Sequence, residues 1–253
     1  MNNYAILIEC DNMRSLGQAC QRDTVNIRNR LLLNTEYKWK IFILTFTPDY
    51  YAKRKITENV FSNILLQDIL KKCVDCKTLY IHISGHGYNT LDNTKQEVDG
   101  RSEYIVLPRE RLIDFHFYNL LKIHIPRNTR LRITVDTCHS GTFSNFQYQL
   151  FKNFSNKNAV RNPKPYFTNA WSISSCTDQQ QSMNDIGNIS GFGGSLTVHL
   201  LDTFESNSSN ACFERFVYSD KTWDIVISCL IKLEEILIKL RQVPILLTDT
   251  LPN

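Results

Sequence analysis

SGHG at Ser84–Gly87 and DTCHSG at Asp136–Gly141 are the two stretches that decide how this chain folds and what it does. Each follows a short run rich in apolar and β-branched residues, 78–84 and 130–136, and both runs are predicted strands. Glycines around His86 and after Cys138 let the backbone turn sharply and leave its amides free. In parallel sheets, functional groups gather beyond the carboxyl ends of strands. The sequence therefore predicts that this histidine and this cysteine meet at one sheet edge.

A cysteine and a histidine in such turns are the residue types that nucleophilic catalysis requires. A thiol attacks only as the thiolate, so Cys138 needs a base, and His86 can supply one and then protonate a leaving amine. The backbone amides of Gly87 and Cys138 are the expected donors to an oxyanion. Taken singly, Cys138 is more typical of a small buried apolar residue, and His86 of a loop histidine. The pairing of the two turns favours catalysis.

The remaining pattern alternates strands with helices, which is typical of an α/β fold with helices on both faces of a mostly parallel sheet. We expect about six strands in that central sheet. The further predicted strands are 4–9, 39–45, 166–174 and 243–247. The predicted helices are 23–33, one capped by Thr57, 195–204 and 222–240. The helix after Thr57 has an expected apolar face of Val60, Phe61, Ile64, Leu65 and Ile69.

Composition excludes several classes of protein. The chain has 253 residues, of which 42% are hydrophobic and 21% charged, which suits one globular α/β domain. A net charge of +4 is too weak and too scattered to predict nucleic-acid binding. The most apolar stretch, 225–240, carries four charged residues and reads as an amphipathic helix, so no membrane span is expected. Eight cysteines in a chain this long without a visible secretory signal favour free thiols and a cytoplasmic location.

With these residues in view, the chain resembles the metacaspase branch of the caspase-like cysteine peptidases. The two quoted stretches carry the resemblance, and their separation is close to the roughly 50 residues between histidine and cysteine in caspases. Further segments are similar to the family at Leu16–Asp23, Ser174–Gln179, Gly193–Gly194 and Gln242–Leu247. The resemblance implies a caspase-like three-layer sandwich in a single catalytic domain, 1–253. Within it we expect a large-subunit-like part, 1–143, a linker loop, 144–165, and a small-subunit-like part, 166–253.

The resemblance also implies an activity, namely hydrolysis of peptide bonds after Arg or Lys by a dyad of Cys138 and His86. The family's pocket for the basic residue maps onto Cys20, Asp23, Ser84 and Asp136. Two carboxylates in a partly dry pocket would pair strongly with a guanidinium or ammonium group. For Asp23 a helix cap, and for Asp136 a hydrogen bond at a strand end, are the structural alternatives.

Calcium is the one cofactor that the resemblance raises, because many metacaspases bind it through several acidic residues. The matching region, Asp99–Glu103, has Ser102 where the family usually has an acid. Asp114 is followed by Phe115, and Asn145 stands where another acid is common. Since calcium takes six to eight oxygen ligands, this acid set looks incomplete. We therefore expect no cofactor, name no metal ligand, and expect activity to persist in a chelator.

Three alternatives and one processing hypothesis stay open from sequence. The alternatives are a catalytically inactive caspase-like protein that acts by binding, a caspase-type specificity for Asp, and a metal-binding regulatory protein. The expected partners are protein or peptide substrates with Arg or Lys before the scissile bond, and the expected state is a monomer. If the linker is exposed, the enzyme can cut itself there, at Lys152, Lys157 or Arg161.

Overall fold

The computed structural model describes most of the N-terminal two thirds of the chain and selected parts of the remainder. The described residues are 2–11, 16, 18–33, 35, 37–46, 62–93, 97, 99–107, 110–150, 157–159, 165–182, 184–185, 193–205, 217 and 245–248.

The helices and strands alternate along the chain, as the sequence pattern predicts. The helices are α1 (Ala19–Leu33), α3 (Ser62–Leu70), α4 (Asp114–His124), α5 (Ser195–Glu205) and the short 3-10 helix η1 (Lys71–Cys73). The strands up to the nucleophile turn are β1 (Asn2–Cys10), β2 (Trp39–Thr45), β3 (Cys76–Gly85), β4 (Gly87–Leu91), β5 (Arg101–Val106), β6 (Arg111–Ile113) and β7 (Arg130–Asp136). The later strands are β8 (Tyr148–Leu150), β9 (Lys157–Ala159), β10 (Ala170–Ser174), β11 (Asn184–Asp185), β12 (Gly193–Gly194) and β13 (Ile245–Thr248).

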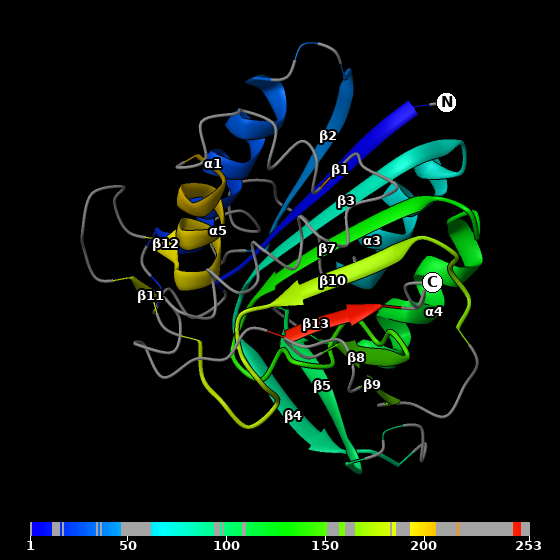
Figure 1. Cartoon of the computed structure of the whole chain (residues 1–253), viewed down its shortest axis with the longest axis vertical. Coiled ribbons are helices and arrows are strands. Elements are labelled where there is room, and N and C mark those ends of the chain that lie inside the picture. The colour runs from blue at the N-terminus through cyan, green and yellow to red at the C-terminus, as the bar shows by residue number, and fades with distance from the viewer. Residues whose placement is uncertain are drawn as a thin grey trace.

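One large twisted sheet forms the centre of the molecule (Figure 1). Its order is β2-β1-β3-β7-β10-β13-β8-β9, and the first five strands are parallel to one another. β13 joins β10 in the antiparallel sense. The expected mostly parallel layer of about six strands is confirmed, and the short β8–β9 pair extends it at one edge.

The strands present different side chains to the two helix layers because successive residues of a strand point to opposite faces. One face packs Ile6, Ile81 and Ile133 into the main apolar core, which also contains Leu66 of α3 and Leu121 of α4. The opposite face carries α1 and α5 (Figure 1), and it is more polar. Its buried residues include Tyr80, His82, Arg132, Thr134, Ser84 and Asp136. The polar groups of the site therefore lie on the α1 side of the sheet.

A second, three-stranded antiparallel sheet, β4-β5-β6, was not expected from sequence. It begins directly after His86 and lies near the carboxyl ends of the parallel strands (Figure 1). In its central strand, RSEYIV, polar and apolar residues alternate too weakly to predict a strand. This small sheet is stabilised by Ile105, which packs in the main apolar core, and by contacts of β5 with α4.

The structure corrects three expected details. α1 begins at Ala19, so Asp23 lies inside the helix and not at its N-terminal cap. Of the apolar face expected for α3, Leu65 and Ile69 are partly buried and pack against the core, but Ile64 is exposed. The fully buried residues of this helix are Leu66 and Leu70, which the expected face did not include. The strand expected at 166–174 begins at Ala170. Val60, Phe61, Thr57 and the helix expected at 222–240 lie outside the described residues.

The segment expected as a linker loop is more ordered at its start than a surface loop. Ser144, Asn145 and Phe146 are buried, and β8 and β9 pair with each other. Lys157 is the first residue of β9, whereas Lys152 and Arg161 lie outside the described residues.

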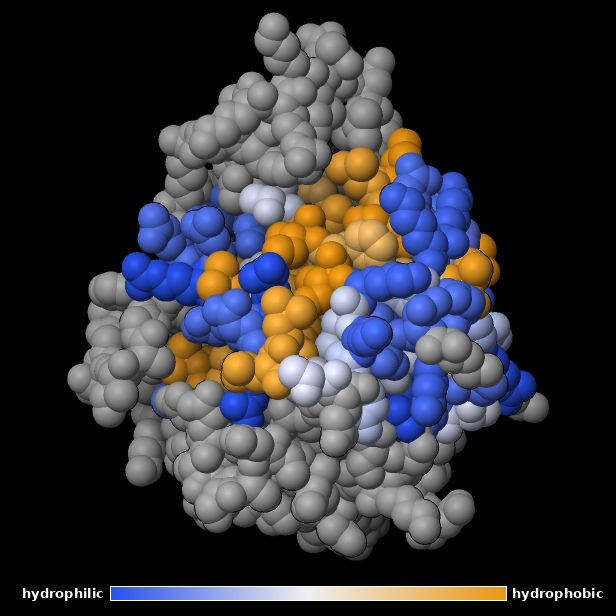
Figure 2. Space-filling view, turned by 90° about the horizontal axis from the view of Figure 1, so that it is seen from above, coloured by the Kyte–Doolittle hydropathy of each residue, from blue (hydrophilic) through white to orange (hydrophobic). Residues whose placement is uncertain are grey.

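Seen from above, an apolar band crosses the molecule between hydrophilic residues (Figure 2). β2 is one of the two edge strands of the described central sheet. The large apolar side chains that α1 and β2 leave exposed are Val25, Leu32, Leu33 and Ile43. Among the described helices, none combines the length and the apolar character that crossing a membrane would require.

Candidate active site

The register between β3 and β7 brings the two sequence stretches together. Ser84 lies opposite Asp136, so His86 and Cys138 each stand two residues beyond a matched pair at the carboxyl end of the sheet. Both line one small pocket together with Ser84 and Asp136. Gly87 lies against the nucleophile turn so closely that a Cβ there would stand 2.1 Å from the carbonyl oxygen of Cys138. The expected meeting of histidine and cysteine turns at one sheet edge is what the structure has.

The backbone of His86 is held by the end of β1. Its amide donates to the carbonyl of Cys10 at 3.3 Å. Gly85 permits this approach, since a Cβ there would lie 2.5 Å from both Cβ and the carbonyl oxygen of Cys10. The imidazole Nε2 of His86 lies 3.5 Å from Oδ1 of Asp11. Asp11 was not singled out from sequence, because no motif marks it and only the β1–β3 pairing places it there.

Cys138 is half-buried, and its thiol donates to the carbonyl of Ser182 at 3.6 Å. Burial raises the pKa of the Cys138 thiol, the hydrogen bond to Ser182 lowers it, and the nearby Asp136 carboxylate raises it. His139 has a positive φ of 51° and its Nδ1 lies 2.6 Å from the carbonyl oxygen of Asp178. That contact engages the ring of His139 with another segment and leaves His86 as the imidazole expected to serve the thiol.

The expected substrate-binding residues also come together. Ser84 donates to Oδ2 of Asp23 at 2.6 Å, and the amide of Gly194 donates to the same carboxylate at 2.9 Å. Asp136 accepts from the amide and the hydroxyl of Thr197 at 2.8 and 2.9 Å. Asp23 is therefore not a helix cap, and Asp136 is a strand-end carboxylate held by the first turn of α5. The sequence had not identified Thr197.

The two carboxyl groups lie next to each other in a dry environment. A Cβ at Gly194 would stand 2.3 Å from Oδ2 of Asp136 and 2.9 Å from Oδ2 of Asp23. Burial raises the pKa of Asp23 well above its ordinary value, and the Asp136 charge raises it further. Burial also raises the pKa of Asp136, against the hydrogen bonds from Thr197. A guanidinium or ammonium group in this pocket would relieve the repulsion between the two acids.

Cys20 completes the set from the first turn of α1. It is buried, and burial raises the pKa of its thiol, while a hydrogen bond with Ser84 acts in the opposite direction. Its role in this geometry is that of a small, uncharged wall beside the two carboxyl groups.

The pocket between these groups is small, enclosing about 30 Å³. Ser182 lines this pocket. Its hydroxyl donates a hydrogen bond to Oδ1 of Asp136 at 2.9 Å, and its carbonyl oxygen accepts a hydrogen bond from the Cys138 thiol. Because the Ser182 hydroxyl already bonds to Asp136, a basic side chain that enters the pocket would compete with it for that carboxylate. The sequence had not identified Ser182, which lies outside both motifs.

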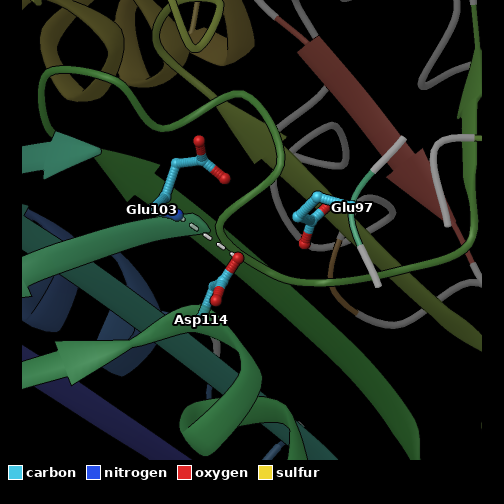
Figure 3. Close-up of side chains that lie close together, drawn as sticks. All are labelled: Glu97, Glu103 and Asp114. Carbon is cyan, nitrogen blue, oxygen red and sulfur yellow. Dashed lines mark hydrogen bonds between the residues drawn. The ribbon is translucent and has the colours of Figure 1, made fainter. Parts of the chain in front are cut away.

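Three acidic side chains, Glu97, Glu103 and Asp114, form a cluster (Figure 3). Glu103 of β5, Asp114 at the start of α4 and Glu97 are all buried, and one carboxylate oxygen of each lies within 4.8 Å of the others. Thr142, four residues after Cys138, donates its hydroxyl to Oε2 of Glu103 and its amide to Oδ1 of Asp178. Burial and the Asp178 charge raise the pKa of Glu103 to about 10.

This cluster fits a hard divalent cation such as calcium. Two oxygens on opposite sides of one calcium ion are about 5 Å apart, so all three carboxylates can reach the same ion. Oε1 of Glu103 is buried and has no hydrogen-bond partner in the part of the chain that the structure describes, and the same holds for both polar atoms of the Asn145 side chain. Ser102 and Phe115 add no carboxylate, as the sequence indicated, but Glu97 adds one that the sequence had not identified.

Comparison with known proteins agrees with this geometry. The model of the metacaspase peptidase C14 domain matches residues 3–147, which is more than half of the chain. Metacaspase-1 of Candida glabrata is 28% identical over 152 residues, covering 58% of this chain and 37% of that protein. Metacaspase-1 of Yarrowia lipolytica is 29% identical over 167 residues, covering 63% and 35%. The chain thus spans somewhat more than a third of the length of these curated relatives.

Solved structures share the fold. The protein GSU0716 of Geobacter sulfurreducens superposes with a TM-score of 0.59 at 18% identity, covering 100% of this chain and 95% of that one. Caspase-1 of Spodoptera frugiperda superposes with a TM-score of 0.53 at 10% identity, covering 98% and 88%. The fold is therefore caspase-like, and with the domain match over residues 3–147 the chain belongs to the metacaspase family of C14 peptidases.

Proposed function

We propose that this chain is a cysteine endopeptidase that hydrolyses peptide bonds after Arg or Lys, with Cys138 as nucleophile and His86 as its acid–base partner. The observation that carries the proposal is the β3–β7 register, in which Ser84 and Asp136 are matched and the two reactive residues follow at the same edge. Family membership supports the peptidase chemistry.

The chemistry proceeds in two steps. The thiolate of Cys138 attacks the scissile carbonyl carbon, and the amides of Gly87 and Cys138 stabilise the oxyanion. The imidazolium of His86 donates its proton to the leaving amine, and a thioester remains. His86 then removes a proton from water and the resulting hydroxide attacks the thioester. The carboxylic acid product leaves, and Cys138 returns to the thiolate beside the imidazolium of His86.

The specificity for a basic residue rests on Asp23 and Asp136. Both are buried, adjacent and fixed by donors from α5, β3 and the Gly194 amide. A guanidinium in the pocket replaces the proton that two adjacent carboxyl groups otherwise share, whereas an Asp side chain would add a third negative charge. This argues against the alternative specificity for Asp.

A bound calcium ion would be held by Glu97, Glu103 and Asp114, and it would supply fixed positive charge to compensate those buried carboxylates. The chain's own contribution is the link from Glu103 through Thr142 to the nucleophile turn.

We further propose that the protein acts as a cytoplasmic monomer on protein or peptide substrates, without nucleic acid or membrane. Size-exclusion chromatography with light scattering tests the monomer: a mass of 29.5 kDa is expected, and a mass twice as large would contradict it.

A substrate scan on the purified protein tests the function. Fluorogenic peptides with Arg or Lys before the reporter should be cleaved, those with Asp should not, and Cys138→Ala or His86→Ala should abolish cleavage with an unchanged melting temperature. Asp136→Ala should cost about 3–5 kcal/mol in kcat/KM for the Arg peptide, since it leaves a buried charge unpaired. Cleavage surviving in Cys138→Ala would refute the nucleophile. A folded wild-type protein that cleaves none of these peptides would favour the inactive binding protein.

A further inference from the structure

We propose that Asp11 is a positioning residue for His86, so that the reactive set is Cys138, His86 and Asp11 rather than a dyad. This inference rests on the proposed peptidase function. Oδ1 of Asp11 lies 3.5 Å from Nε2 of His86, and both side chains are largely buried, at 6% and 15% exposure.

The backbone explains why Asp11 stands there. β1 and β3 are parallel neighbours, and Cys10 is matched with Gly85. The amide of His86 donates to the carbonyl of Cys10, and the lack of a side chain at Gly85 lets the two strand ends touch. The next residue on each strand is then Asp11 and His86. Their contact is thus a consequence of register in the core of the sheet, not of a mobile surface loop.

Burial gives the contact a direction. Oδ1 of Asp11 is buried and accepts no hydrogen bond from any residue that the structure describes. An unsatisfied buried carboxylate oxygen is unfavourable, and an Nε2–H of the imidazole would be a donor to it at this distance. Catalytic hydrogen bonds are often long without substrate and shorten in the complex, so 3.5 Å is compatible with that role.

The chemical consequence follows from the two nitrogens of the ring. With Nε2 directed to Asp11, Nδ1 is the ring nitrogen that would take the proton of Cys138. A carboxylate behind the imidazole fixes its orientation and stabilises the positive charge that appears when the thiol ionises, as in other triads. Cys138 benefits from such help because burial disfavours its thiolate.

Kinetics of four variants test the inference. Asp11→Asn and Asp11→Ala should lower kcat for the Arg peptide roughly tenfold to a hundredfold with KM within about twofold, because Asp11 touches the base and not the substrate. Asp11→Glu should recover part of kcat. Asp75→Asn, which removes a carboxylate that contacts the opposite end of β1, should match the wild type. A wild-type kcat in Asp11→Asn and Asp11→Ala, or an equal loss in Asp11→Glu and Asp11→Ala, would overturn the inference.

Two measurements separate this inference from the proposed function. If the wild type cleaves no peptide, the alkylation rate of Cys138 by iodoacetamide still reports on its ionisation: a roughly tenfold slower rate in Asp11→Asn supports Asp11, and an equal rate contradicts it. If Asp11 variants do not fold, nitrogen NMR of histidine-labelled wild type decides. A proton on Nε2 of His86 is expected, and an Nδ1–H tautomer with bare Nε2 would refute the contact.

Discussion

At the scale of single residues, Gly194 shows how tightly the specificity pocket is built. Its missing Cβ is the space in which the carboxyl groups of Asp23 and Asp136 approach each other, and its amide donates to Asp23. Gly194→Ala must push at least one carboxylate aside. Because a misplacement of about 1 Å can cost about a hundredfold, we expect kcat/KM for the Arg peptide to fall by that factor.

The control for Gly194→Ala lies in the nucleophile, which the substitution does not touch. Alkylation of Cys138 by iodoacetamide should change by much less than kcat/KM, since this reaction needs no basic side chain in the pocket and the Asp136 carboxylate affects only the pKa of the thiol. An unchanged kcat/KM in a folded Gly194→Ala protein would show that Asp23 and Asp136 do not receive the substrate's basic residue.

At the scale of elements, the joint between β7 and β10 depends on a buried arginine. Arg132 is fully buried on the polar face of the sheet and donates hydrogen bonds to the backbone and side-chain oxygens of Asn169. Its Cζ lies 4.1 Å from the centroid of the Trp171 ring. Arg132→Ala leaves a cavity and unsatisfied acceptors, so we expect the free energy of unfolding to fall by about 3 kcal/mol. Urea denaturation measures this.

Arg132→Lys is the matched variant for that joint, because it keeps the charge but cannot make the forked hydrogen bonds to Asn169. It should lie between the wild type and Arg132→Ala. A loss below about 1 kcal/mol in Arg132→Ala would show that the β7–β10 pairing is held by backbone and apolar contacts alone.

At the scale of the whole molecule, buried acids make stability depend on pH in an unusual direction. Burial raises the pKa of Asp178 to about 6, so its folded form keeps a proton that the unfolded form loses near pH 4. Stability from this group is complete below pH 4 and is lost as pH rises through 6. The loss is about 3 kcal/mol, and Asp178→Asn should remove it. Urea unfolding between pH 4 and 7 in the presence of a chelator checks this prediction. If the free energy of unfolding changed with pH to the same extent in the wild type and in Asp178→Asn, the prediction would be contradicted.

A cation in the acidic cluster should act on the same stability. Calcium should raise the melting temperature of Cys138→Ala protein, and Glu97→Gln should weaken that effect, while Asp99→Asn, at an exposed neighbouring carboxylate, should not. The expectation from sequence that activity persists in a chelator stays a prediction. An EGTA-treated enzyme that keeps its activity but melts at a lower temperature would agree with both predictions. An enzyme that loses its activity in EGTA and regains it with calcium would contradict the prediction that activity persists in a chelator.

The sequence by itself determined the strands that end at Ser84 and Asp136, the glycine-flanked turns after them, and the candidate residues that those turns carry. These are local properties, set by apolar runs, β-branched residues and glycine, and they can be recognised without knowing the neighbours. Cys20 and Asp23 came from resemblance and not from spacing, yet the structure brings them to Ser84 and Asp136.

Only the tertiary structure decided which distant residues complete the site. Asp11 reaches His86 through the β1–β3 register, Thr197 reaches Asp136 from α5, and Ser182 occupies the pocket from a segment without a motif. Glu97, from the connection between β4 and β5, joins Glu103 of β5 and Asp114 of α4, beside a small sheet whose pattern was too weak to predict. Each of these contacts depends on strand register and helix placement, which arise from packing over the whole core and leave no periodic signal in the local sequence.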